Sequence, residues 1–107
     1  MAARYLMRFG WSVVARNWRC RDGELDLICR EPDGTVVVCE VKSRTGRGYG
    51  TPLEAITQEK ARRLRRLTAA WAREQAAPIH TLRIDAVGVL WHPDGTASVT
   101  HERGIAR

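Results

Sequence analysis

Cysteine is scarce in this chain, and its arrangement argues against two kinds of small protein. Cys20, Cys29 and Cys39 are odd in number and show no short paired spacing, so neither a disulfide framework nor a zinc site is expected. Cys29 and Cys39 fall within predicted strands, where buried free thiols in a reducing cytoplasm are the expected state. The three histidines also lack the spacing of metal ligands, and we assign them no function.

The sequence also lacks a long apolar run, an internal repeat and a low-complexity segment. No stretch approaches the length of a membrane span, and Arg4 and Arg8 occupy the first nine residues where a signal peptide would be apolar. No linker divides the 107 residues. We therefore expect one cytoplasmic domain over residues 1–107, with a single modest core.

Acidic residues are in the minority. Twelve Asp and Glu stand against 18 Lys and Arg, and the resulting formal net charge of +6 favours an anionic partner, most often nucleic acid. Hydrophobic residues make up 44% of the chain, which is typical of a folded globular protein. The few aromatic residues show no spacing that indicates base stacking, so we expect Trp18, Trp71 and Trp91 to pack in or beside the core.

Alternating and valine-rich segments predict five strands. The segments 11–18, 24–30 and 35–43 are short and joined by turn signals, so they are expected to form an antiparallel meander. The nearly continuous apolar run 80–91 predicts a central strand covered on both faces. The segment 96–101 follows a further turn and predicts an edge strand.

Two helices are predicted beside these strands. Residues 2–9 form the last part of a helix that Gly10 ends. A long helix begins with a capping box of Thr51 and Glu54. Its apolar stripe comprises Leu53, Ile56, Leu64, Leu67 and Trp71. Because this helix connects the third strand to the fourth, it should place them parallel, which gives an α/β fold with a mixed five-stranded sheet flanked by helices.

Two carboxylates and a lysine are predicted to meet on this sheet. Glu40 and Lys42 share one face of the third strand, and Asp26 lies on the neighbouring strand. Two carboxylates about 4 Å apart repel by roughly 4 kcal/mol at an effective dielectric near 20, so a divalent cation, a proton or the lysine must offset the repulsion.

Such a group suits metal-assisted cleavage of a phosphodiester. Asp26, Glu40 and the carbonyl of Val41 would hold Mg²⁺ or Mn²⁺, a bound water would attack phosphorus, and Lys42 would orient that water and neutralise the transition state. The alternative is structural, with Glu40 and Lys42 forming an ordinary ion pair and Asp26 capping a turn.

Other charged residues are candidates for a supporting role. Lys60 falls on the apolar stripe, where it either snorkels past the core or points over the site. Glu24 and Gln58 are weaker candidates at the site, and Asp85 beside Arg83 is expected to form a structural charge pair. A group of arginines forms either a merely solvated face or a surface that binds successive backbone phosphates, and we favour the second interpretation. These arginines are Arg44, Arg47, Arg62, Arg63 and Arg66.

Motifs along most of the chain resemble one known family. They are GWSVVARNWR at 10–19, GELDLI at 23–28, VVVCEVKSR at 36–44, YGTPLEAITQEKARRL at 49–64 and LRIDAVGV at 82–89. With these motifs the chain resembles the YraN family of small bacterial proteins. That family is grouped by similarity with Holliday-junction resolvases and the PD-(D/E)xK, restriction-endonuclease-like nucleases. GELDLI together with EVKSR is the specific part, because Glu-x-Lys alone is common.

The resemblance implies a restriction-endonuclease-like three-layer core and a set of site residues. Asp26 would be the motif aspartate, Glu40 and Lys42 the (D/E)xK pair, and Lys60 a lysine that recurs in the family pattern. The implied cofactor is a divalent cation, Mg²⁺ or Mn²⁺. The family usually has a Gly-x-x-Gly-Glu stretch in its first helix; no glutamate precedes Glu24 here, so the domain is expected to lack the start of that helix.

The activity implied by the resemblance is hydrolysis of DNA, with branched or single-stranded DNA as candidate substrates. The resemblance also allows a homodimer, since resolvase-like relatives often work as dimers. Two alternatives belong to other classes. One is a catalytically inactive nucleic-acid-binding module on the nuclease fold, and the other is a protein-interaction partner in DNA metabolism.

Overall fold

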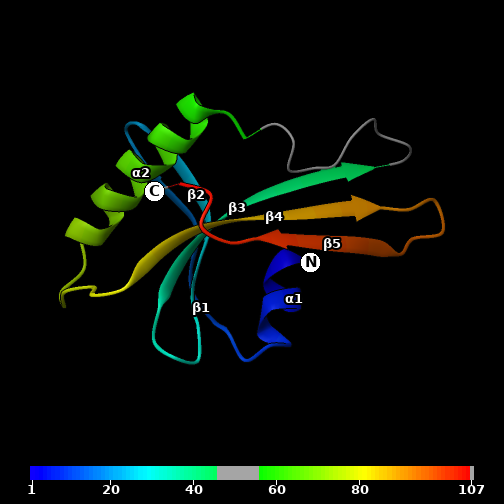
Figure 1. The fold of residues 1–107 in the computed structure, drawn as a ribbon, viewed down its shortest axis with the longest axis horizontal. Helices are drawn as coiled ribbons and strands as arrows, with labels where there is room; N and C mark the ends of the chain where they lie inside the picture. The colour runs from blue at the N-terminus through cyan, green and yellow to red at the C-terminus, as the bar shows by residue number, and fades with distance from the viewer. Residues whose placement is uncertain (46–55, 107) are drawn as a thin grey trace.

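The computed structural model describes residues 1–45 and 56–106, which form a five-stranded sheet with two helices (Figure 1). The mixed α/β class and the expected strands are confirmed. In chain order the elements are α1 (Ala2–Met7), β1 (Ser12–Cys20), β2 (Gly23–Arg30), β3 (Val36–Thr45), α2 (Gln58–Arg73), β4 (Leu82–Trp91) and β5 (Ala97–Glu102).

The strands lie in the order β1-β2-β3-β4-β5. β1, β2 and β3 form the predicted antiparallel meander, β4 is parallel to β3 and β5 is antiparallel to β4. The parallel arrangement is the one expected from a helical crossover. At the β1–β2 turn, a Cβ on Gly23 would lie 3.3 Å from a methyl group of Leu67, so glycine lets α2 pack closely on this hairpin.

Alternate residues of β3 point into two separate cores, one under each helix. Val37 and Cys39 pack with Leu6 of α1, whereas Val36 and Val38 pack with Leu64 of α2 and its neighbours. α1 and α2 therefore cover opposite faces of the sheet. Each fully buried aliphatic side chain contributes roughly 1.5–3 kcal/mol.

The buried thiols that the sequence predicts are present. Cys29 and Cys39 are both fully buried and free. A hydrogen bond with the Cys29 thiol, together with burial, raises the pKa of Cys39, so this thiol stays protonated. Trp71 is buried in the core under α2, and Trp18 and Trp91 pack at the margins of the two cores, as expected.

The start of α2 differs from the prediction. The helix begins at Gln58, and Thr57 caps it in an extended conformation by accepting a hydrogen bond from the Lys60 N–H at 3.1 Å. Ile56 and Thr57 are not helical, so a helix continuous from Thr51 is wrong. Thr57 supplies a side-chain hydroxyl oxygen to the first turn of the helix, which is the feature for which Thr51 was predicted to be the cap. The predicted cap at Thr51 and the stripe residue Leu53 lie outside the described residues.

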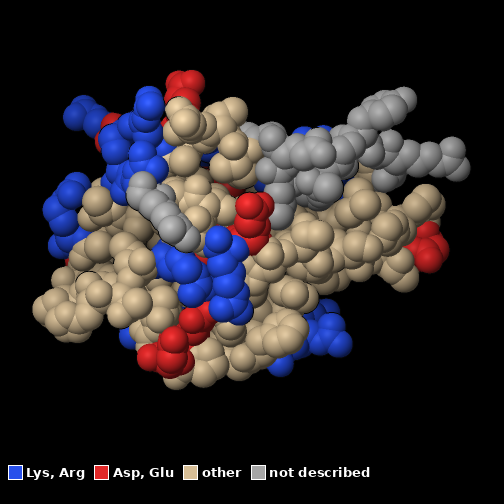
Figure 2. Space-filling model, viewed as in Figure 1, with Lys and Arg blue, Asp and Glu red and all other residues tan. Residues whose placement is uncertain are grey.

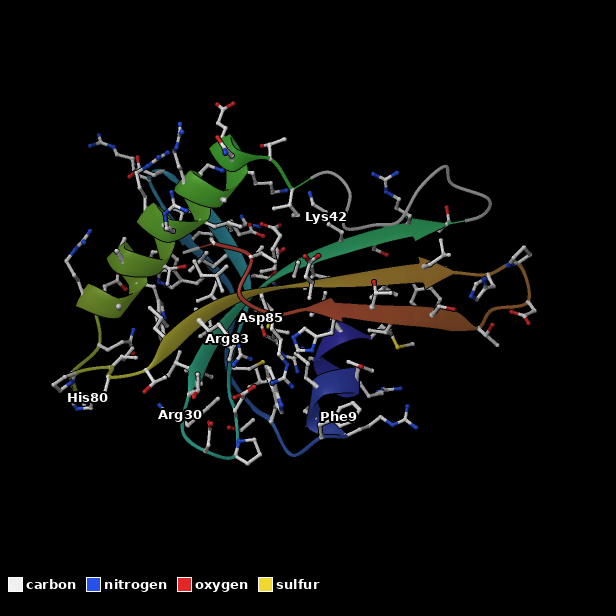
Figure 3. All side chains as sticks on the ribbon, in the orientation of Figure 1. Phe9, Arg30, Lys42, His80, Arg83 and Asp85 are labelled. Carbon is white, nitrogen blue, oxygen red and sulfur yellow. The ribbon has the colours of Figure 1, made fainter. Side chains whose placement is uncertain are left out.

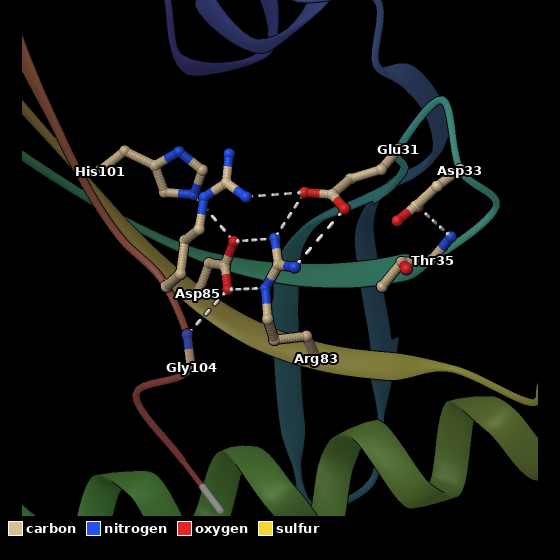
Figure 4. Close-up of polar contacts among 8 residues, drawn as sticks. Glu31, Asp33, Thr35, Arg83, Asp85, His101 and Gly104 are labelled. Atoms are coloured by element: carbon tan, nitrogen blue, oxygen red, sulfur yellow. Dashed lines mark hydrogen bonds and ion pairs between the residues drawn. The ribbon is translucent and has the colours of Figure 1, made fainter.

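A network of buried charge ties β4 to β5 and to the end of β2 (Figure 4). Asp85 is fully buried and accepts two hydrogen bonds from Arg83, at 2.7 and 2.9 Å, so the predicted charge pair is confirmed. The Gly104 N–H donates to Asp85 at 3.0 Å, and His101 Nε2 lies 2.8 Å from it. Arg83 also contacts Glu31 at 2.7 Å. No sequence pattern indicated that His101 and Glu31 would join this network.

No helix in residues 1–45 and 56–106 is both long and apolar enough to span a membrane.

Candidate active site

β2 and β3 separate where the site was predicted. Their pairing ends at Leu27 and Cys39. Just beyond that pair, Asp26 Oδ2 accepts a hydrogen bond from the Val41 N–H at 2.9 Å, where a backbone carbonyl would otherwise be the partner. The N–H and C=O of a strand residue point to the same side, so the Val41 carbonyl faces the same opening. Asp26 and Val41 thus present oxygens to one place.

Glu40 lies beside Asp26 and is also approached from α2. Lys60 Nζ lies 3.7 Å from Glu40 Oε1, and the two side chains are only 18% and 13% exposed. The cap at Thr57 places Lys60 in the first turn of the helix, opposite β3. Lys60 therefore points over the site and does not snorkel to solvent.

Lys42 completes the group from β3, on the side where α2 begins (Figure 3). Burial and the adjacent Asp26 carboxylate raise the pKa of Glu40, against the lowering effect of Lys60 and Lys42. Burial and the nearby Lys42 ammonium lower the pKa of Lys60, against the raising effect of Glu40. These mutual effects place two acids and two lysines together. We call Asp26, Glu40, Lys42 and Lys60 the acid–lysine cluster.

The donor atoms of this cluster suit a hard divalent cation. Mg²⁺ is commonly held by one or two carboxylates and keeps several waters, and Asp26, Glu40 and the Val41 carbonyl offer oxygens only. Among residues 1–45 and 56–106, no third His, Cys, Asp or Glu joins the two carboxylates. Glu24, a weaker candidate, instead pairs with Arg19 at 2.8 Å. Burial first, and then the adjacent Asp26 carboxylate, raises the pKa of Glu40, and a cation bound between the two carboxylates would lower it.

The amino-acid sequence matches one family over residues 1–89, described as "Uncharacterised protein family UPF0102". The chain belongs to the UPF0102 family. Similar proteins, each named "UPF0102 protein", occur in Nocardioides sp. (46% identity over 105 residues, 98% of this chain and 84% of the relative) and in Nocardia farcinica (48% over 105 residues, 98% and 82%). Another, from Clavibacter michiganensis, is 50% identical over 99 residues, which are 92% of this chain and 83% of the relative.

The match to the UPF0102 family confirms the YraN-type family that the motifs indicate. The matched residues contain the complete acid–lysine cluster and end at Val89 within β4. His101, which contacts Asp85, lies beyond them.

Two of the predicted arginines of this UPF0102 protein, Arg63 and Arg66, lie beside Lys60 of the cluster. Lys and Arg are concentrated over α2 at the upper left of Figure 2. Lys60 belongs both to the cluster and to a hollow of about 220 Å³ on the helix surface, lined also by Thr57, Glu59, Arg63 and Arg66. Arg62 and Arg44 are exposed, Arg44 near the end of β3, whereas Arg47 lies outside the described residues.

Sequence reasoning missed two residues on the other side of Asp26. Arg16 and Asn17 of β1 line a cavity of about 350 Å³ together with Asp26, Val41 and the first three residues of the chain. Asn17 has a φ of +50°, and it is the only non-glycine residue with positive φ in the described part of the chain. The excess of arginine in the N-terminal segment was the signal that could have indicated this surface.

Proposed function

We propose that this UPF0102 protein is a metal-dependent nuclease that hydrolyses DNA phosphodiesters on a restriction-endonuclease-like fold. The observation that carries the proposal is the convergence of the acid–lysine cluster at the point where β2 leaves β3. Two carboxylates and two ammonium groups, all partly buried, form a costly arrangement for a purely structural site. For a reaction that needs a cation and an anionic phosphate side by side, the same arrangement is useful.

Each residue of the cluster has a distinct task in this proposal. Asp26 and Glu40, with the Val41 carbonyl, would hold Mg²⁺ or Mn²⁺. The hydrogen bond from the Val41 N–H fixes one oxygen of Asp26 and so orients the carboxylate. When bound, the cation supplies Lewis-acid stabilisation of the phosphoryl oxygens and activates water.

The lysines would act on the phosphate. Lys42 and Lys60 place positive charge at the edge of the carboxylate pair, where they can bind the scissile phosphate and stabilise the charge that grows in the transition state. The pairing of Lys60 with Glu40 keeps its ammonium group in place before DNA arrives. The net charge of +6 and the arginines of α2 support a polyanionic substrate.

The fold is consistent with this chemistry. Helices on opposite faces of a mixed sheet give the three layers expected of a restriction-endonuclease-like core. The acids lie on two neighbouring strands, Asp26 on β2 and Glu40 on β3, which supports the assignment of a (D/E)xK-type site.

One observation favours a second candidate. In the described part of the chain two carboxylates meet and no third joins them, so the site offers ligands for one cation and no further acid to serve as a general base; the second candidate is a DNA-binding module that keeps the fold without cutting. Binding and cleavage therefore have to be measured separately.

The test begins with calorimetric titration of Mn²⁺ and Mg²⁺ into the wild type, Asp26→Asn and Glu24→Gln. Glu24→Gln is a matched control, because it removes a carboxylate from the same strand outside the cluster. The same proteins, with Lys42→Ala and Lys60→Met, are then assayed on single-stranded, duplex, flap and four-way-junction DNA.

We expect Asp26→Asn to lose metal binding and cleavage together, and Glu24→Gln to keep both. Lys42→Ala should keep metal binding and lose on the order of 10²- to 10³-fold in cleavage rate, as when a single charge-stabilising group is removed. If the wild type binds no metal and cuts no substrate while DNA binding persists, the nuclease proposal is overturned in favour of the binding module.

A further inference from the structure

The N-terminal segment carries positive charge with no acidic residue to balance it. Residues 1–21 contain five arginines and neither Asp nor Glu. Arg19 pairs with Glu24 on the neighbouring strand. Arg4, Arg8 and Arg16 are exposed, and none of the three has an ion-pair partner within residues 1–45 and 56–106.

These three arginines line a cavity that adjoins a second one, and the second cavity contains Asp26 of the acid–lysine cluster. A cavity of about 520 Å³ between α1 and β1 is lined by Arg4, Arg8 and Arg16 together with Met1 and Ala3. The cavity of about 350 Å³ next to Asp26 shares Met1, Ala3 and Arg16 with it. We call the combined depression the α1 groove. Its inner end contains Asp26, a residue of the candidate active site.

The conformation of β1 helps to open this inner end. The register passes from Arg16 opposite Leu27 to Trp18 opposite Leu25, which leaves Asn17 opposite Asp26. Asn17 takes a left-handed conformation there, and asparagine is among the few residues that tolerate it. Non-glycine residues with positive φ are uncommon, and residues in sparsely populated backbone conformations cluster at active sites and ligand clamps.

The cluster therefore lies between two basic surfaces. On one side, Lys60 links it to the hollow on α2 with Arg63 and Arg66. On the other side, Asp26 links it to the α1 groove. A DNA strand whose phosphodiester reaches the cluster must leave it in two directions. The phosphates that flank the scissile bond on each side then lie near one of the two basic surfaces, whose guanidinium groups attract them.

We propose that the α1 groove binds backbone phosphates on one side of the scissile bond through Arg4, Arg8 and Arg16, while the α2 hollow binds those on the other side. This inference rests on the proposed function, because it takes DNA as the ligand. The guanidinium group suits the task, since its planar fork binds phosphate oxygens with two parallel hydrogen bonds. The chemistry selects the phosphodiester backbone, which single strands and duplexes share.

The test is equilibrium binding without metal. A fluorescein-labelled 20-nucleotide single strand and the matching duplex are titrated in EDTA, by fluorescence anisotropy, at several salt concentrations. The groove variant carries Arg4→Gln, Arg8→Gln and Arg16→Gln. The matched control removes the same charge at exposed positions outside both basic surfaces, and it carries Arg21→Gln, Arg30→Gln and Arg73→Gln.

For the groove variant, the slope of log K against log salt should fall by about 2 on single strands and by about 2.7 on duplex, because each lost phosphate contact removes about 0.7 or 0.9. At 0.1 M salt this corresponds to affinity weaker on the order of 10²-fold for the single strand. The control should lose far less, since exposed charges more than about 10 Å from the DNA are screened at this ionic strength. Replacing the three arginines by lysine should restore the slope.

Failure of the inference can be told apart from failure of the proposed function. If the groove variant and the control lose affinity equally, the α1 groove is not a binding surface, whatever the wild type cleaves. If the wild type shows no salt-dependent DNA affinity at all, the inference and the nucleic-acid proposal fall together. Equal thermal unfolding temperatures of the two triple variants exclude misfolding as the cause of a difference.

Discussion

Removal of the Asp85 carboxylate should strongly destabilise this protein, because the carboxylate holds together groups from three parts of the chain. Asp85 is fully buried and has contacts with Arg83, His101 and the Gly104 N–H. Asp85→Ala would leave these groups without their shared acceptor. The guanidinium of Arg83 would keep one acidic partner, Glu31, at 2.7 Å.

The expected loss of folding stability in Asp85→Ala follows from these contacts. Breaking a buried ion pair by removing one partner costs about 3–5 kcal/mol. Because Arg83 retains Glu31, we expect a value near the lower end, about 3 kcal/mol. In a domain of this size each kcal/mol shifts the unfolding temperature by roughly 4–8 °C, so Asp85→Ala should unfold about 12–24 °C below the wild type.

The pH dependence gives a second, independent measure. Burial alone would raise the pKa of Asp85, but hydrogen bonds from Arg83, Gly104 and His101 outweigh it and hold the pKa below the ordinary value of 3.8. The folded state therefore binds this proton less readily than the unfolded state. The stabilisation by Asp85 is complete well above pH 3.8 and is lost as the pH falls through the lower folded-state pKa. The difference in the free energy of unfolding between the wild type and Asp85→Ala should therefore become smaller in that acidic range.

The assay is guanidinium unfolding followed by tryptophan fluorescence, repeated from pH 7 downward. Trp11 is a suitable probe, because it is buried and its ring lies 5.4 Å from that of His101. Glu24→Ala serves as the control, since it breaks the exposed Arg19–Glu24 pair and should cost no more than about 1 kcal/mol. A loss in Asp85→Ala no larger than in this control would refute the reasoning.

Two further predictions concern the surroundings of the site. Glu40→Gln should stabilise the metal-free protein at pH 7.5 by about 0.5–2 kcal/mol, the range of other single stabilising replacements. Because the folded-state pKa of Glu40 is raised, the gain should disappear below about pH 4.5, and a less stable variant at pH 7.5 would contradict the electrostatic account. Asn17→Ala should cost about 1–2 kcal/mol through its left-handed backbone while Asn17→Gly costs less, and equal chemical-unfolding curves for the two would exclude backbone strain.

The strands and their connections could be predicted because their signals are local. β3 shows this well, since a valine-rich run between two turn signals predicted residues 35–43 and the strand spans Val36–Thr45. The parallel pairing of β3 and β4 followed from the helix between them.

The start of α2 could not be chosen from local chemistry. Thr51 and Thr57 both offer a capping hydroxyl, and the helix uses Thr57. The helix start also depends on how α2 packs over β3, where Lys60 contacts Glu40. This packing is a tertiary effect that a local capping motif cannot indicate.

The part of the site that lies on neighbouring strands could be predicted from the sequence. Asp26 and Glu40 were expected together because β2 and β3 are joined by a short turn. The position of Lys60 stayed open, since its distance from Glu40 depends on how α2 crosses the sheet. His101 and Asp85 are 16 residues apart, and no pattern in either segment indicated their contact.

The strands occupy the sheet in the same order in which they are synthesised. By the time residue 45 has left the ribosome, the three strands of the meander have been synthesised, and three strands with an apolar face meet the minimum that independent stability requires. Both carboxylates and Lys42 belong to this first part of the nascent chain, whereas Lys60 arrives only with α2. The acidic half of the cluster can thus assemble first, and its repulsion is relieved when the crossover helix docks over β3.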